Sequence, residues 1–171
     1  TIFENELIQL RDDLKRMCFM VEAVYEKLFS AMQLGDRSTI IDISEQDHQV
    51  RDMEKQIESR CLSLITKQQP MARDLRMVSA SLKVVTDIKR VGDHVVDIAE
   101  LLLRMNIKDF AAYSGHLDEM VRETKEMFHD SVGAFLKRSK DEAEQVIEKD
   151  DVIDELFNTV KRDLIEHLKK D

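Results

Sequence analysis

Three aspartates have the residue type and the spacing to bind a divalent cation. Asp93 and Asp97 are four residues apart, so a helix would place both carboxylates on one face, one turn apart. Asp47 lies on the apolar face of an earlier predicted helix, where an unpaired carboxylate is costly, and helix geometry places it near the level of the other two. Carboxylate oxygens are the ligands that hard cations prefer. The pattern therefore permits a metal site formed by Asp47, Asp93 and Asp97.

The same carboxylates could instead be neutralised by basic side chains. Lys89 lies four residues before Asp93, where its ammonium can pair with that carboxylate and would repel a cation. The pairs expected on this interpretation are Lys89 with Asp93, Asp47 with Arg90 or Lys89, and Glu54 with Lys83. The residues alone leave the metal site and the salt bridges as alternatives.

A long helix is predicted to carry Asp93 and Asp97. It extends from Pro70 to about Asn106, because proline suits the first turn of a helix and no other proline follows. One face of this helix is apolar, and the charged residues fall on the opposite side. The apolar residues of that face are Val84, Ile88, Val91, Val95, Ile98, Ala99 and Leu102. Gly92 lies in the middle of the helix, which indicates close packing of a neighbouring helix there.

Four more helices are predicted, and two of them repeat the other two. Alternating apolar spacings of four and three residues predict helices up to Gly35, over residues 38–66, from Gly115, and from Asp141 to the end. A shift of the sequence by 103 positions aligns Leu14 with Leu117, Met17 with Met120, Ala31 with Ala134, and Asp47 with Asp150. The turn at Gly35-Asp36 then falls on Arg138-Ser139. The fourth and fifth helices therefore repeat the first and second.

The repeat predicts an all-α fold of tandem antiparallel three-helix bundles. Residues 1–106 would form the first bundle, and residues 107–171 would supply the first two helices of a second. The third helix of the second copy would begin near position 173, just beyond the last residue. We expect either that the natural chain is longer or that another chain covers the open face of the last two helices.

Two Glu-x-x-His pairs suggest a different metal chemistry. Glu45 with His48 and Glu126 with His129 have the spacing of the ligands in di-iron carboxylate bundles, which would make the protein an oxidase or a metal store. The repeat disagrees with this interpretation, because a shift by 103 positions does not place one pair on the other. A symmetric dinuclear site is therefore not expected.

Composition limits the functions further. The net charge of −9 argues against binding to nucleic acid or to an anionic membrane surface. No apolar run is long enough to span a membrane, so we expect a cytoplasmic protein without direct membrane insertion. We find no nucleophile with an adjacent base and no glycine-rich phosphate loop, and therefore expect no enzymatic activity.

Two neighbouring motifs resemble a known family. Gln69-Pro70-x-Ala72-x-Asp74-Leu75-Arg76, followed by Asp87-Ile88-Lys89-Arg90-Val91-Gly92-Asp93-His94, is similar to the signature helix of the PhoU family, helical regulators of bacterial phosphate uptake. The resemblance implies two three-helix bundles and metal clusters, of iron or another divalent metal, held by an E/D-x-x-x-D motif in the signature helix. This chain departs from the motif, because Lys89 stands where the usual acid would precede Asp93, and only Asp93-x-x-x-Asp97 remains.

The resemblance also implies a function. PhoU proteins act in negative control of phosphate uptake and of the phosphate starvation response, through contacts with the ATPase subunit of the phosphate ABC transporter and with a phosphate sensor histidine kinase. A homodimer is expected as well. The alternatives are a helical carboxylate protein that binds or stores metal, and a PhoU-like regulatory domain of a sodium–phosphate transporter.

Overall fold

Helices account for nearly all of the residues that the computed structural model describes, which are residues 1–45, 48–106 and 114–170. The helices are α1 (Ile2–Leu34), α2 (Arg37–Glu45), α3 (His48–Gln68), α4 (Ala72–Leu103), α6 (Ser114–Lys137) and α7 (Lys140–Leu168). The predicted all-α fold is confirmed. None of the described helices is both long and apolar enough to cross a membrane.

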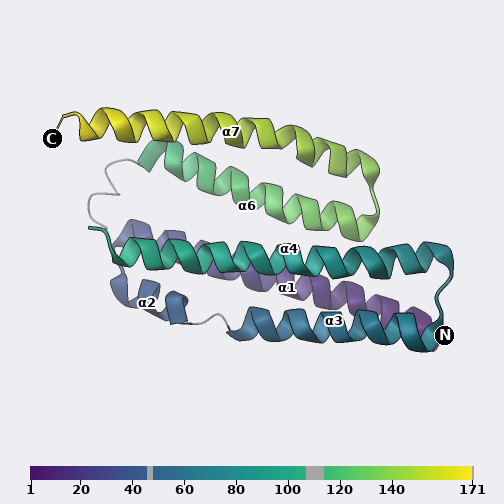
Figure 1. Ribbon diagram of the computed structural model, residues 1–171. Coiled ribbons are helices and arrows are strands. Elements are labelled where there is room, and N and C mark those ends of the chain that lie inside the picture. Colours follow the sequence, from purple (N-terminus) through teal and green to yellow (C-terminus); the bar gives the residue numbers. More distant parts are fainter. Residues whose placement is uncertain (46–47, 107–113, 171) are drawn as a thin grey trace.

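The helices form one bundle and one hairpin (Figure 1). In the bundle α1, α3 and α4 lie side by side, and α2 packs against α1 and α4 near the C-terminal end of α4. The hairpin of α6 and α7 lies beside this bundle, and α6 contacts α1 in the antiparallel direction. The predicted domain boundary between residues 106 and 107 adjoins a segment outside the described residues, so that boundary stays a prediction.

The boundaries of two predicted helices differ from the structure. Where one helix was predicted over residues 38–66, the structure has α2 and α3 on either side of residues 46–47. The next helix, α4, begins at Ala72 rather than at Pro70, because Met71 precedes it with extended backbone at φ −64° and ψ 158°. Gln69 before the proline takes a positive φ of 43°. The turn between α3 and α4 therefore lies about two residues later in the chain than predicted, at residues 69–71 instead of 67–69.

The two hairpin turns have the same backbone structure at positions 103 residues apart. Gly35 and Arg138 both adopt the left-handed conformation, with φ of 65° and 56°. The following residue, Asp36 or Ser139, accepts a hydrogen bond from the backbone N–H three residues later, at 3.1 and 3.2 Å. Two backbone hydrogen bonds at the first turn recur at the second. The bond from Gly35 N to Met32 O matches the one from Arg138 N to Phe135 O. The bond from Asp36 N to Ala31 O matches the one from Ser139 N to Ala134 O. The register of the predicted repeat therefore holds at both turns.

The contact between α1 and α6 has approximate two-fold symmetry. His129 Nδ1 lies 2.7 Å from Glu22 Oε1, and Lys125 forms an ion pair with Glu26. In the repeat Lys125 is equivalent to Glu22, and His129 is equivalent to Glu26. The same two positions therefore pair in both directions, as they do across a symmetric dimer interface.

A second polar pair occurs at the same level in both hairpins, with the aspartate on the first helix in one hairpin and on the second helix in the other. Asp13 of α1 is fully buried and accepts a hydrogen bond from Arg60 Nε of α3 at 3.1 Å. Arg60 also lies 2.8 Å from Glu6. The residues equivalent to Asp13 and Arg60 are His116 of α6 and Asp163 of α7, which are 2.7 Å apart. Each pair links the first helix of its hairpin to the second, and the buried carboxylate is the one held by an arginine.

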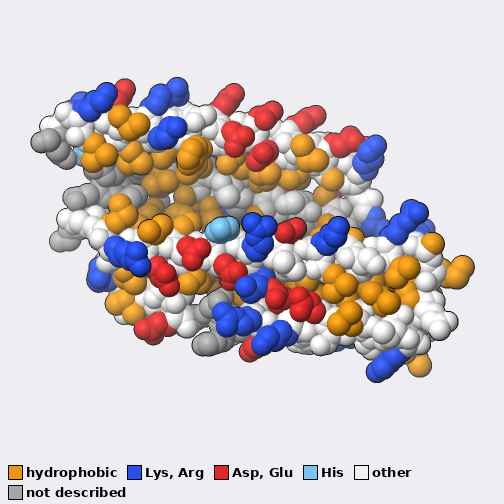
Figure 2. Space-filling model, in the orientation of Figure 1, with side chains coloured by type: hydrophobic (Ala, Val, Ile, Leu, Met, Phe, Trp, Pro, Cys, Tyr) orange, Lys and Arg blue, Asp and Glu red, His pale blue; other side chains and the backbone are white. Residues whose placement is uncertain are grey.

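The first bundle is well packed, whereas one face of the hairpin is open. Leu14 and Met17 of α1 are fully buried, but their equivalents on α6, Leu117 and Met120, are only half-buried. Phe157 of α7 is 56% exposed. Figure 2 shows hydrophobic side chains gathered in the hollow between α7 and α4. Among the described residues, the hairpin face that corresponds to the face covered by α4 in the bundle is therefore uncovered.

Candidate functional site on α4

Gly92 fixes the position of α4 in the bundle. A Cβ atom at Gly92 would lie 3.4 Å from Val50 of α3 and 3.5 Å from Val21 of α1, so the three helices meet closely at this point. The close packing predicted at Gly92 is confirmed. Because Gly92 faces the core, Lys89 and Asp93 lie on the flank of α4 nearest α3.

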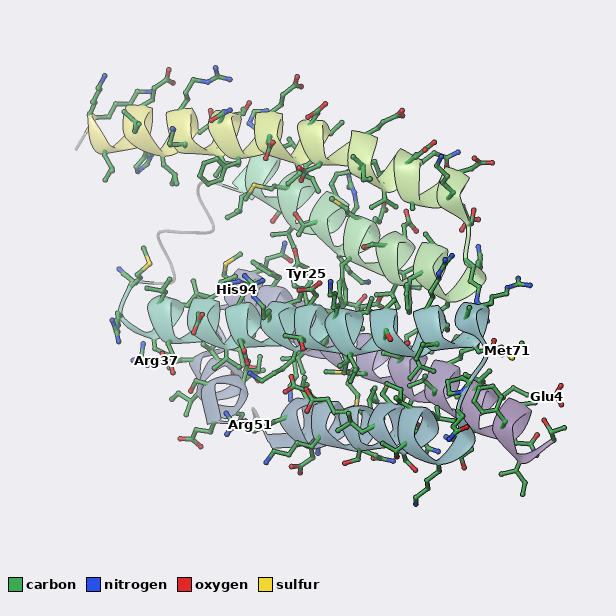
Figure 3. All side chains as sticks on the ribbon, turned by 45° about the vertical axis from the view of Figure 1, so that its right-hand side comes forward. Glu4, Tyr25, Arg37, Arg51, Met71 and His94 are labelled. Carbon is green, nitrogen blue, oxygen red and sulfur yellow. The ribbon has the colours of Figure 1, made fainter. Side chains whose placement is uncertain are left out.

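The candidate metal ligands on α4 are engaged by basic side chains. Lys89 Nζ lies 2.8 Å from Asp93 Oδ2, and both side chains are partly buried. Asp97 is mostly exposed, and its carboxylate lies 3.7 Å from His94 Nδ1. Figure 3 shows His94 on the outer side of α4, away from α3. The pair predicted between Lys89 and Asp93 is therefore present.

The metal site predicted from Asp47, Asp93 and Asp97 stays a prediction. Asp47 lies outside the described residues. Within residues 1–45, 48–106 and 114–170, no three His, Cys, Asp or Glu side chains are grouped so as to hold a metal ion. On the described flank of α4, the positive charge beside Asp93 comes from Lys89.

Glu54 of α3 lies near Lys89 and Asp93, and these three residues are named here the α4 cluster. The sequence predicted a different partner for Glu54. Its Oε2 atom is buried and accepts no hydrogen bond in the described part of the chain. Burial raises the pKa of Glu54, the carboxylates of Glu58 and Asp93 raise it further, and Lys89 and Arg51 oppose the shift. The predicted pair with Lys83 is wrong. Because the turn before α4 lies later in the chain than predicted, Lys89 rather than Lys83 lies near Glu54.

The Glu-x-x-His pairs do not form a common site in the described residues. His129 is paired with Glu22, and Glu126 lies 3.9 Å from Lys149 of α7. Both side chains of the second pair are therefore engaged by other partners. The side chain of His48 lies outside the part of the structure that is described.

A cleft of about 620 Å³ lies between α1, α6 and α7, away from the α4 cluster. Its lining combines basic residues such as Arg11, Lys15 and Lys149 with acids, and it includes Cys18. Burial, with a smaller contribution from Glu22, raises the pKa of the Cys18 thiol to about 12. The raised pKa keeps the thiol protonated near neutral pH, which makes it a poor nucleophile. Sequence periodicity gave no signal for this cleft, because three helices from both repeats form it.

The α4 cluster brings opposite charges together on two packed helices. It joins one ammonium, on Lys89, to the carboxylates of Asp93 and Glu54 on two packed helices. Among the described residues around it, no hydroxyl or thiol stands next to a general base. The arrangement can hold charge and can present it to a partner.

Comparisons with known proteins agree with this description. A family model described as the PhoU domain matches residues 14–102 and 117–171. A phosphate-specific transport system accessory protein PhoU homolog of Clostridium acetobutylicum is 34% identical over 99% of this chain and 78% of its own length. The PhoU accessory protein of Escherichia coli K12 is 29% identical over 99% of this chain and 70% of its own. The crystal structure of the phosphate transport system regulatory protein PhoU from Streptococcus pneumoniae superposes with a TM-score of 0.88 at 25% identity, over 98% of this chain and 79% of that one.

Proposed function

The chain belongs to the PhoU family, and we propose that it is a cytoplasmic, non-enzymatic accessory protein that represses phosphate uptake and the phosphate starvation response. Relatives at 29–34% identity over nearly the whole chain are named as phosphate-specific transport system accessory proteins, which supports a role in phosphate transport. The observation that carries the proposal is the match of fold and sequence along almost the full chain, rather than any single residue.

Regulation by contact is the mechanism that the described surface favours. The described cluster on α4 has charges but no nucleophile beside a base, and the acidic chain is a poor receptor for the phosphate anion. We therefore propose that the phosphate signal arrives through partner proteins. The proposed partners are the ATPase subunit of the phosphate ABC transporter and a phosphate sensor histidine kinase. The homodimer and the bound iron or other divalent metal stay predictions.

Deletion of the gene tests the proposal. In phosphate-rich medium a reporter for the phosphate uptake genes should be repressed in the parent strain and expressed in the deletion strain. A plasmid with the wild-type gene should restore repression, and an empty plasmid serves as the control. A reporter that stays repressed by phosphate in a strain without any copy of the gene would contradict the proposed function.

A further inference from the structure

The segment around the α3–α4 turn, at one end of the first bundle, differs in charge from the rest of the sequence. Residues 59–86 contain five Lys or Arg and one Asp, which leaves 21 of the 26 basic and 34 of the 35 acidic residues for the remainder. Arg60 is engaged with Asp13 and Glu6. Arg73, Arg76 and Lys83 of α4 are exposed, and none of them forms an ion pair within the described parts of the chain. These three residues are therefore available cations on an acidic protein.

The same end exposes apolar side chains. Met71 is 80% exposed, Leu62 of α3 is 55% exposed, and Leu75 of α4 is 39% exposed. Figure 2 shows hydrophobic side chains gathered where α3 ends and α4 begins, with Lys and Arg side chains along α4 beside them. In Figure 3, Met71 projects from this end of the bundle. An apolar patch bordered by charge is typical of a protein interaction site.

We propose that this surface, formed by Leu62, Met71, Arg73, Leu75, Arg76 and Lys83 and named here the basic end, binds an acidic amphipathic helix of a partner protein. Arg76 and Lys83 are seven residues apart, so they lie on one side of α4 about 10.5 Å from each other. A partner helix aligned with α4 meets both cations when it has carboxylates at positions i and i+7. Apolar residues beside those carboxylates then contact Leu75 and Leu62.

The charge distribution favours an acidic protein segment over a membrane. Three exposed cations give little attraction to an anionic lipid surface, which would also repel the 34 acidic residues in the rest of the chain. A single acidic helix contacts only the basic end, so it meets fewer of those acids than a lipid surface would. The inference rests on the proposed function, because the partners that supply the helix are those of a regulator that acts by contact.

Peptide binding tests the inference. The probes are overlapping 25-residue peptides that cover the transporter ATPase and the cytoplasmic part of the sensor kinase, titrated with the full chain. We expect binding by peptides that carry acids at i and i+7 next to apolar residues. Arg76→Glu together with Lys83→Glu should weaken this binding about tenfold or more, and Leu75→Ser should also weaken it. The matched control is Arg16→Glu with Lys27→Glu on α1, which changes the net charge equally at exposed positions and should change binding much less.

Several outcomes would overturn the inference. These are binding by no peptide, equal binding by basic and acidic peptides, or equal effects of the two double reversals. Sedimentation with phosphatidylglycerol vesicles that depends on Arg76 and Lys83 would assign the surface to lipid, and self-association lost on the same reversal would assign it to a second copy. If deletion of the gene leaves the reporter repressed while the peptides still bind, only the proposed function is rejected. If deletion derepresses the reporter while no peptide binds, only this inference is rejected.

Discussion

The ammonium of Lys89 is the charge that sets whether the carboxylates of the α4 cluster attract a cation. It pairs with Asp93 and lowers the cost of the buried carboxylate of Glu54, so it supplies on this flank the positive charge that a metal ion would supply. A divalent cation at Asp93 and Asp97 would have to displace or tolerate this ammonium. Lys89 and a divalent cation would therefore compete for the carboxylate of Asp93.

Lys89→Glu should create a response to divalent cations. The substitution replaces a repelling charge by a third carboxylate one turn from Asp93, so added Mn²⁺ or Mg²⁺ should raise the thermal unfolding midpoint of this variant by binding the native state alone. The wild type should respond little, because Lys89 repels a cation, and the control variant Asp93→Ala with Asp97→Ala should respond little, because it lacks two carboxylate ligands. Equal responses of all three proteins would eliminate a metal site on this part of α4.

Glu54→Gln should stabilise the protein near neutral pH. The native pKa of Glu54 lies above its ordinary value of 4.5, so the native state binds the proton more tightly than the unfolded state does. Glu54 therefore favours folding below the ordinary pKa and loses that contribution as the pH rises through the native pKa. Urea titrations should show the variant more stable than wild type at pH 7, with the difference disappearing below about pH 4. Glu148→Gln on the exposed side of α7 is the control, and a gain of equal size there would contradict the explanation.

At the scale of elements, the turn residues Gly35 and Arg138 offer a matched comparison. Both have positive φ, which glycine adopts freely and which costs other residues about 1 kcal/mol. Arg138→Gly should therefore raise the free energy of unfolding by about 1 kcal/mol, and Gly35→Ala should lower it by a similar amount. Apart from Gly35 and its two chain neighbours, no heavy atom lies within 4 Å of a Cβ placed on Gly35, so the alanine side chain meets no steric clash there. Thermal unfolding of both variants tests this, and changes of the same sign would disagree with it.

The sequence predicted the elements that depend on local pattern. Apolar spacing gave the helices, and the 103-residue register gave both turns, because Gly35-Asp36 and Arg138-Ser139 end and begin helices through local backbone bonds. The helix predicted over residues 38–66 corresponds to α2 and α3, and the two residues between them lie outside the described residues. The partner of Glu54 was missed. The partner of Glu54 depends on the register between the antiparallel helices α3 and α4. An error of two residues in the start of α4 shifts this register and so changes every pair between the two helices.

At the scale of the whole molecule, the two halves differ in how far their cores are covered. Ile57 and Cys61 of α3 are fully buried, while the equivalent Val160 of α7 is 8% exposed and Leu164 is half-buried. Local opening requires less exposure of new apolar surface where the surface is already partly exposed. The hairpin of α6 and α7 should therefore open more readily than the bundle of α1, α3 and α4.

Hydrogen exchange measured by mass spectrometry tests this difference in the 171-residue chain. Backbone amides near Val160 and Leu164 should exchange faster than those near Ile57 and Cys61, with the repeat supplying residues of like position in like helices. Amides in the last turn of each helix serve as a control for ordinary fraying. Equal protection at the matched positions would contradict the expectation.

The paired contacts between α1 and α6 bear on the origin of the chain. If two copies of the first half met as α1 and α6 do here, Glu22 and Glu26 of one copy would face Glu26 and Glu22 of the other, and four carboxylates would repel. In this chain Lys125 and His129 occupy the second set of positions. An interface of this kind is the expected product of gene duplication of a self-pairing hairpin, followed by divergence of one copy to a complementary charge. The divergence commits the first half to its own second half and discourages exchange of halves between molecules.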